Sequence, residues 1–402
     1  MYRRILVALD GSQQSDLAMQ AALHLAALGE NLELIGCHVY AARLHEARFA
    51  QMEPGLPENY QTEEALCDLR GTHDDLITQG MHVISDAYLA PLARAARDSG
   101  LTWEGQTPEG RNYVELLRII RDRNPDLITL GAFGQGHVPE SALGSVTERV
   151  LLHADSCDVL TMRQPWSFRE RPIVVGVDGS DSSFAALGRA LQIAQACGAS
   201  VIAVAVYDPF FHNTVFRTIA QALPEAQRDR FDFPAQEQLH NEIIDKGLEN
   251  LYAEGLRQGT RLAESMGITI ETRTLAGKVY PQLHHYAAAC NAGLVVVGRR
   301  GLHREPQSLI GSNALALARL TTSNLLVVSP PPEGAASPIP SASAESASIG
   351  WTPEAEQALK RVPGFVRRVV RKRVEDYARE RQIAEITAET FQHVARLAGM
   401  GY

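Results

Sequence analysis

Two glycine-rich segments share one spacing and carry the clearest chemical signal in the chain. In the first, Gly131 and Gly134 are followed, after nine intervening residues, by Gly144-Ser145. The same spacing recurs as Gly298, Gly301, Gly311 and Ser312. Glycine lets a backbone approach a ligand closely, and the free N–H groups that begin a helix favour phosphate. The pattern predicts two sites for the phosphate chain of a nucleotide.

An Asp-Gly-Ser turn ends an apolar run in each half of the chain. The run from Ile5 ends at Asp10, and the run from Ile173 ends at Asp178. If each run is a strand of a parallel sheet, a ligand would bind outside its carboxyl end. The carboxylate could then accept a hydrogen bond from a ribose or a base. It could equally close an Asx turn, which needs no ligand.

Signatures of dedicated enzymes do not accompany these residues. In the first glycine segment, His137-Val138 stands where a P-loop needs Lys and Ser/Thr. The dinucleotide fingerprint, the hydrolase nucleophile elbow and the zinc-protease helix motif are also missing from the sequence. His284-His285 is a poor metal pair, because adjacent residues on a helix point in different directions. The residues therefore favour binding over catalysis, and they predict no catalytic or metal-binding residue.

The elements around these motifs repeat. The segment 5–12 recurs at 173–180, an offset of 168, and the glycine segments recur at an offset of 167. Landmarks more than a hundred residues apart thus keep their register, which indicates an internal duplication. Within each half, helical patterns at 17–28 and 184–196 precede strand-like runs at 34–40 and 201–207. Ser15 and Ser183 are the expected helix N-caps.

Continuously apolar strands are typical of a parallel sheet covered by helices on both faces. The sequence therefore predicts an α/β fold with two tandem five-stranded parallel-sheet, Rossmann-like domains at 1–165 and 170–329. Long segments at 41–98 and 209–266 separate the second and third strands of each domain. In the first of these, a helix is expected at about 75–97, after a polar stretch at 51–72.

Residues 330–350 hold five Pro, five Ser and five Ala, which indicates a linker. A small helical module is expected at 351–402. Its first helix begins with Thr352-Pro353, and its third follows Thr387, with Ile386 and Phe391 as a hydrophobic staple. Between them, apolar residues at helical spacing (Val366, Val369, Val370, Val374, Tyr377 and Ala378) oppose a basic run at 367–373.

Composition narrows the possible partners. The chain has 402 residues, of which 45% are hydrophobic and 21% charged, with a net charge of −9. Only residues 351–402 are basic, with ten Lys/Arg against seven Asp/Glu, so a nucleic-acid partner is not expected. The five cysteines form no Cys-x-x-Cys pair and suggest buried thiols in the cytoplasm. No apolar run approaches the length of about 18 residues that a membrane span needs.

The strand ending in Asp, the second strand ending in Val-Tyr and the glycine spacing together resemble the ATP-binding branch of the universal stress protein family. The resemblance covers nearly all of residues 1–329, twice over. It implies adenine near the first-strand Asp and the second-strand Val, with the phosphates on the glycine loop. The first implied site comprises Asp10, Val39, Gly131, Gly134, Gly144, Ser145 and Val146. The second comprises Asp178, Val206, Gly298, Gly301, Gly311 and Ser312.

The second copy departs from this pattern after its Gly-Ser pair. Asn313-Ala314 replaces Val146-Thr147, so weaker nucleotide binding is expected there. The nearby basic residues are either phosphate contacts or solvated surface charge: Arg299, Arg300, His303 and Arg304.

The tail resembles the C-terminal module of the catalytic B subunit of light-independent protochlorophyllide reductase. The resemblance rests on segments 351–355, 362–368, 375–381 and 386–387. Nothing else in the chain resembles the reductase core, and the scattered cysteines cannot hold its iron–sulfur cluster. The tail is therefore expected to dock a protein partner, to cover a tetrapyrrole, or to pack as a simple appendage.

The sequence as a whole predicts a stress-response or regulatory protein that binds ATP, with or without magnesium, in both halves. The apolar runs at 159–162 and 325–328 are expected to pair the halves within one chain, and a homodimer is a further expected assembly. Two alternatives stay open: a slow ATPase or phosphoryl-transfer enzyme, and an adaptor that binds a tetrapyrrole through its tail.

Overall fold

A computed structural model describes most of the chain. The described residues are 1–29, 31–167, 170–209, 218–219, 221–224, 245–302, 309–330, 350–361, 367, 370–371, 374–375, 377–378, 381 and 383–397. They form two units: one combines Met1–Asp208 with Tyr252–Pro338, and the other combines Pro209–Leu251 with Ile339–Tyr402. Apart from residues 330 and 350, the predicted linker lies outside the described residues.

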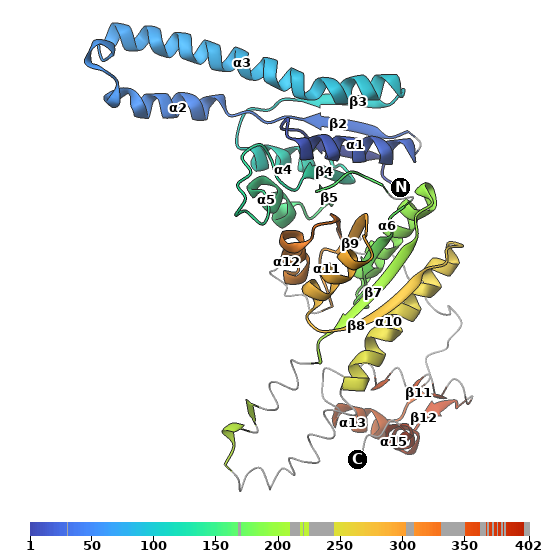
Figure 1. Cartoon of the computed structure of the whole chain (residues 1–402). Coiled ribbons are helices and arrows are strands. Elements are labelled where there is room, and N and C mark those ends of the chain that lie inside the picture. Colours follow the sequence, from blue (N-terminus) through green and yellow to red (C-terminus); the bar gives the residue numbers. More distant parts are fainter. Residues whose placement is uncertain are drawn as a thin grey trace. The chain divides into compact units, whose positions relative to one another are not determined.

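The first unit is built on one ten-stranded sheet with the order β3-β2-β1-β4-β5-β10-β9-β6-β7-β8 (Figure 1). The strands of the first half are β1 (Arg4–Ala8), β2 (Glu33–Cys37), β3 (Thr102–Gln106), β4 (Leu127–Gly131) and β5 (Asp158–Met162). Those of the second half are β6 (Ile173–Gly176), β7 (Val201–Tyr207), β8 (Glu271–Ala276), β9 (Leu294–Gly298) and β10 (Asn324–Val328). Neighbouring strands within each half run parallel, which confirms the predicted α/β class.

The helices lie between the strands in chain order. The first half contains α1 (Gln13–Ala27), α2 (Ala42–Met52), α3 (Glu63–Asp98), α4 (Asn112–Arg123) and α5 (Ser145–His153). The second contains α6 (Asp181–Cys197), α10 (Asp245–Ser265), α11 (Val279–Ala289) and α12 (Ser312–Leu320). The core strands are buried along their whole length, because helices cover them. Continuous apolar runs are the sequence signature of this burial.

The helices that follow each Asp-Gly-Ser turn begin earlier than the sequence suggests. Ser12 and Ser180 are their N-caps, and each side-chain oxygen accepts the N–H three residues on. Ser15 and Ser183, the expected caps, instead donate those N–H groups at 3.1 Å and are buried. The earlier start has a simple physical cause. The turn places Ser12 and Ser180 in an extended conformation, which is typical of an N-cap, so each helix begins at the next residue.

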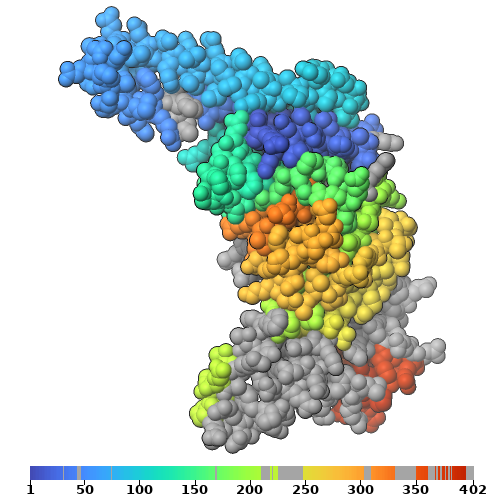
Figure 2. Space-filling model, in the orientation of Figure 1, coloured from blue at the N-terminus to red at the C-terminus, as the bar shows by residue number. Residues whose placement is uncertain are grey.

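The segment between β2 and β3 differs from its prediction. Helix α3 begins at Glu63, twelve residues before the expected start, and α2 was not predicted. Thr62 caps α3, and Arg70 donates two hydrogen bonds of 2.7 Å to Glu53. The polar stretch is helical because α2 and α3 pack against each other, and the pair extends beyond the sheet (Figure 1; Figure 2).

The two halves meet where β5 and β10 pair in antiparallel fashion, which confirms the predicted pairing of the halves within one chain. Side chains at the start of each strand secure the junction. Asp158 on β5 accepts hydrogen bonds from Tyr2, from Arg189 and from the Ser329 N–H. On β10, the buried Asn324 accepts the N–H groups of residues 163 and 164 at 2.9 and 3.1 Å.

All five cysteines are free thiols, but they are not all buried. Cys37 and Cys157 are buried, and burial raises the pKa of each thiol to about 12. Cys67 is exposed on α3, which contradicts the expectation of a buried thiol. The polar composition around Cys67 gave no indication of a helix, so its exposure on α3 was not predicted.

The tail has its own small core. It contains β11 (Gly350–Trp351), α13 (Pro353–Arg361), β12 (Glu385–Ile386) and α15 (Ala388–Leu397). Thr352 and Thr387 cap the two helices through their hydroxyls, as predicted. The buried residues are Ala355, Leu359, Val370, Val374, Ala378, Ile386, Phe391 and Val394. Val366, Val369 and most of the basic run lie outside the described residues.

Candidate functional site

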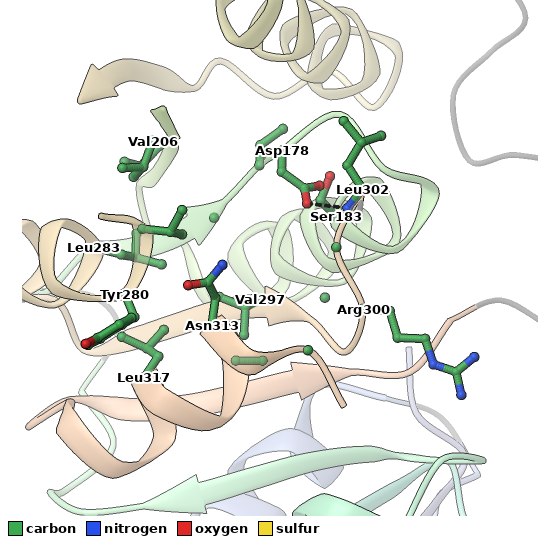
Figure 3. Close-up of a pocket in the computed structure, with 18 of the residues that line it drawn as sticks. Asp178, Ser183, Val206, Tyr280, Leu283, Val297, Arg300, Leu302, Asn313 and Leu317 are labelled. Carbon is green, nitrogen blue, oxygen red and sulfur yellow. Dashed lines mark hydrogen bonds between the residues drawn. The ribbon is translucent and has the colours of Figure 1, made fainter. Parts of the chain in front are cut away.

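A cavity of about 400 Å³ lies at the carboxyl edge of β6, β7 and β9, beside the N-terminus of α12 (Figure 3). All six residues of the second implied site line it: Asp178, Val206, Gly298, Gly301, Gly311 and Ser312. They come from four segments spread over more than a hundred residues of sequence. The parallel sheet brings them together because the carboxyl ends of its strands meet at one edge.

Asp178 fastens the glycine loop to the end of β6. One carboxylate oxygen accepts the Ser180 N–H at 3.0 Å and the Ser180 hydroxyl at 2.6 Å. The other accepts the Leu302 N–H at 2.8 Å, a bond visible in Figure 3. The aspartate therefore forms the Asx turn that the sequence left open, and it also holds the loop in place. Its position at the cavity wall leaves it available to a ligand as well.

The loop glycines are required by close packing within the chain. A Cβ at Gly298 would lie 2.6 Å from the Ser182 Oγ, and one at Gly301 would lie 2.8 Å from the Asp178 Oδ2. Gly311 donates its N–H to the Arg299 carbonyl at 2.7 Å and is the N-cap of α12. The segment thus brings main-chain groups and a helix N-terminus to the cavity. Such a surface favours an anion.

The rest of the cavity wall is apolar and aromatic. Its lining includes Val206, Tyr252, Val279, Tyr280, Leu283, Val297 and Leu317. Figure 3 shows Val206 and Leu283 on the side of the cavity away from Arg300. Burial and two nearby carboxylates, Asp178 and Asp208, raise the pKa of Tyr252, so its phenol stays neutral. One end of the cavity therefore suits a flat apolar ring and the other suits an anion.

Arg299 does not contact this cavity, although it was one of the basic residues considered as phosphate ligands. Its side chain is fully buried and donates to the carbonyl oxygens of Leu151, at 2.6 Å, and Ala154. Those residues end α5 in the first half. Burial lowers the pKa of Arg299, yet cations are favourable at the C-terminus of a helix. Its role is therefore to join the two halves.

Arg300 lines the cavity. Its Nε is buried and has no hydrogen-bond partner among the described residues. Figure 3 shows the guanidinium directed away from the labelled residues of the cavity wall. His303 and Arg304 lie outside the described residues.

The first half places its implied residues in the same order. Asp10 accepts the Ser12 N–H at 3.0 Å and the Gln135 N–H at 3.1 Å, so it also holds its glycine loop. A Cβ at Gly134 would lie 2.3 Å from its carboxylate. Gly144 is the N-cap of α5, which begins with Ser145-Val146, and Val39 is buried beyond the end of β2.

The position of the Thr147 hydroxyl bears on the expectation that the second half binds nucleotide more weakly. It donates to the Gly131 carbonyl at 2.7 Å and is buried, so it contacts the protein. The replacement of this threonine by Ala314 in the second half therefore removes an internal bond. Weaker binding in the second half does not follow from that replacement.

Sequence reasoning missed the aromatic lining, including Tyr252 and Tyr280. Tyr280 had a usable signal, since it repeats Tyr113 at the same offset of 167 as the glycine segments. Tyr252 lies in the long segment between the second and third strands, where the sequence pattern did not predict secondary structure clearly.

Among the described residues, no group of three His, Cys, Asp or Glu side chains is placed to hold a metal ion. Within the same residues, no helix is both long and apolar enough to cross a membrane.

Comparison with known proteins agrees with this architecture. A universal stress protein from Archaeoglobus fulgidus covers 82% of this chain and 98% of its own, with a TM-score of 0.52 and 16% identity, which shows a shared fold. A universal stress protein of Mycobacterium tuberculosis is 28% identical over 134 residues, which are 33% of this chain and 42% of that protein.

The tail has a separate relative. The B subunit of light-independent protochlorophyllide reductase from Adiantum capillus-veneris is 57% identical over 42 residues, which are 10% of this chain and 8% of that protein. The chain therefore spans less than half the length of either of these curated relatives.

Family profiles cover both parts of the chain. The family described as "Proto-chlorophyllide reductase 57 kD subunit" matches residues 351–394, which confirms the resemblance of the tail. The profile of the universal stress protein family matches residues 1–163 and again residues 170–329. Both matched segments contain an Asp-Gly-Ser turn and a glycine loop on the parallel sheet described above. The chain therefore belongs to the universal stress protein family, with two tandem copies of its domain.

Proposed function

We propose that this protein binds an adenine nucleotide, ATP in particular, in the cavity of its second half. The observation that supports this most is the composition of one cavity wall. Asp178, Val206 and the glycine loop converge there with the N-terminus of α12. A volume of about 400 Å³ lies within the range of about 300–1,000 Å³ that is typical of small-molecule sites.

Each part of the cavity has a matching part of the ligand. The apolar end, with Val206 and Leu283, suits the adenine ring, and Asp178 can accept a hydrogen bond from the ribose or the base. The first N–H groups of α12 have no intrahelical partner, and with the glycine loop they suit the phosphates. Magnesium would accompany the phosphates as part of the ligand.

Binding without efficient turnover fits this lining better than catalysis does. Asp178 is the only carboxylate among the residues that line the cavity, and it already accepts three hydrogen bonds from its own chain. A general base for the attacking water is thus missing from the described lining. We therefore propose a regulatory, stress-response role, in which ATP stabilises one conformation of the protein. A ligand at a hundredfold excess over its Kd contributes about 2.7 kcal/mol to stability.

The N-terminus of α12 offers a precise test. Ser312→Pro removes one N–H at the first helical position, where proline is tolerated, and Gly311 already has φ and ψ compatible with a following proline. We expect the ATP affinity to fall by about tenfold or more, since a hydrogen bond to a charged group contributes about 1.5–3 kcal/mol. Isothermal titration calorimetry with ATP, ADP, AMP and GTP measures the change.

Ser312→Ala is the matched control, because it removes the hydroxyl and keeps the N–H. Its affinity should fall by less than that of Ser312→Pro. Mass spectrometry of nucleotide that remains bound through purification identifies the natural ligand. The proposal is wrong if millimolar ATP neither binds nor raises the Tm of the unmodified protein.

A further inference from the structure

The helix beside the Asp-Gly-Ser turn differs in sequence between the two halves, and one of the differing positions faces the turn. Helices α3 and α10 end at Asp98 and Ser265, and each is followed by a glycine with positive φ, Gly100 at 67° and Gly267 at 71°. These pairs share the offset of 167 that relates the glycine loops. By the same offset, Tyr88 on α3 corresponds to Gly255 on α10.

Tyr88 fills the space above the Asp-Gly-Ser turn of the first half. A Cβ at Gly11 would lie only 2.3 Å from the Tyr88 Cε1, so the ring packs directly on that glycine. The ring is also edge-on to His38, with centroids 5.0 Å apart. The Tyr88 hydroxyl accepts a hydrogen bond of 2.7 Å from the Gln135 side chain. One side chain of α3 thus bridges the turn and the glycine loop.

The support for this arrangement is specific to the first half. The His38 ring is hydrogen-bonded at 2.8 Å to Ser85, one turn before Tyr88 on α3, and both residues are buried. Gln135 follows Gly134, and its own N–H binds Asp10 at 3.1 Å. Tyr88 is therefore held by His38, which follows β2 and is bonded to Ser85 on α3, and by Gln135 of the glycine loop.

The second half lacks this bridge at the equivalent positions. Gly255 brings no side chain, and its Cα faces Gly179, whose N and Cα would lie 3.5 Å from a Cβ at position 255. Ala205 and Leu302 replace His38 and Gln135. Tyr252 replaces Ser85 and lines the cavity.

We propose that Tyr88 closes the first crevice and that Gly255 keeps the second one open, so each chain binds one nucleotide. The inference rests on the proposed function and adds the residue pair that decides which half is the site. It reverses the ranking suggested by the sequence, which favoured the first half. The first half then serves as a partner for the second through the shared sheet.

Binding stoichiometry tests the proposal, measured by calorimetry with ATP on the full-length protein. The unmodified protein should bind one equivalent. Gly255→Tyr should weaken ATP binding at least a hundredfold, because it places an aromatic ring over Gly179. Tyr88→Gly should add a second equivalent in the first half. Tyr88→Ala is measured alongside it, since alanine keeps the propensity of α3 for helix.

Two conservative variants serve as matched controls. Tyr88→Phe keeps the ring over Gly11 and removes only the bond to Gln135, so it should still bind one equivalent. Gly255→Ala adds a methyl group at an ordinary contact distance of 3.5 Å, so the Kd should change less than threefold. In the Tyr88 variants, an unchanged Kd at the second site reports that the protein is folded.

The outcomes separate this inference from the proposed function. Two equivalents for the unmodified protein, or one equivalent for both Tyr88→Gly and Tyr88→Ala, would overturn the role of Tyr88 and leave ATP binding intact. Unchanged binding by Gly255→Tyr would exclude the second half as the site. No binding by the unmodified protein would overturn both proposals.

Discussion

At the scale of single residues, Arg299 has the least expected role. It follows the last residue of β9 within the glycine loop, but its guanidinium lies at the C-terminus of α5 in the other half. A buried cation is costly unless polar partners satisfy it. Here two helix carbonyls and the helix dipole provide that compensation. The main chain of Arg299 therefore belongs to the second glycine loop, where its carbonyl accepts the Gly311 N–H, while its side chain links this loop to the first half.

Replacing Arg299 tests whether its hydrogen bonds to α5 stabilise the junction between the two halves. Arg299→Met keeps much of the side-chain volume but leaves the Leu151 and Ala154 carbonyls without their donors. We expect the free energy of unfolding to fall by about 2–4 kcal/mol, because buried polar groups lose their partners. Urea denaturation followed by circular dichroism measures it. Arg300→Met is the control and should cost less than about 1 kcal/mol. Equal losses in the two variants would contradict the assignment.

At the scale of elements, each glycine loop depends on close contact with the helix after the Asp-Gly-Ser turn. Gly298 at the end of β9 packs against Ser182 in the first turn of α6. Phe133 in the first loop donates its N–H to the Gln14 side chain on α1 at 2.8 Å. The strand end, the described start of the loop and the next helix thus pack together in each half.

A pair of glycine substitutions in β9 and α6 should have opposite effects. Gly298→Ala would bring a Cβ within 2.7 Å of Ser182 backbone atoms, and we expect it to cost about 1–3 kcal/mol of stability by overpacking. Gly188→Ala lies on α6 with no atom within 4 Å of its Cβ, and we expect it to add about 0.5–1 kcal/mol through helix propensity. Differential scanning calorimetry of both variants measures the effect. A stable Gly298→Ala protein would contradict the packing argument.

At the scale of the whole first unit, the two tandem domains share one continuous sheet. The pairing of β5 with β10 merges two five-stranded sheets into one. Buried polar groups lie across this junction, including the ion pair of 3.0 Å between Asp158 and Arg189. Such groups fix the register of the two strands, because any slip would leave them without partners.

The continuous sheet predicts cooperative unfolding. We expect both halves to unfold in a single thermal transition, and Asn324→Ala should lower the free energy of unfolding by about 1–3 kcal/mol, since it leaves two N–H groups unsatisfied. Native-state hydrogen exchange should show loss of protection in β5 and β10 together. Asn313→Ala, on α12 at the cavity, is the control and should leave that protection unchanged. Two separate transitions in the unmodified protein would argue against a shared core.

How far the sequence could predict this protein depended on the range of the interactions involved. The strands, the Asp-Gly-Ser turns and the glycine spacing were predictable, because they depend on local apolar runs and on turn chemistry. Helix α2 and the first part of α3 were not, since their polar sequence becomes helical through mutual packing. The role of the Arg299 side chain was also not predicted, because its hydrogen-bond partners Leu151 and Ala154 lie 148 and 145 residues away in the sequence.

The amino-acid sequence by itself determined the duplication, the α/β class and the residues that converge at each sheet edge. The duplication and the class follow from periodicity and spacing, and the site residues follow from the glycine spacing together with the resemblance to the universal stress protein family. Only the tertiary structure decided the direction and register in which β5 and β10 join the halves, that Arg299 belongs to their junction, and that Tyr88 lies over one turn while Gly255 lies over the other. Those outcomes depend on which surfaces meet in space, and sequence spacing alone does not specify that.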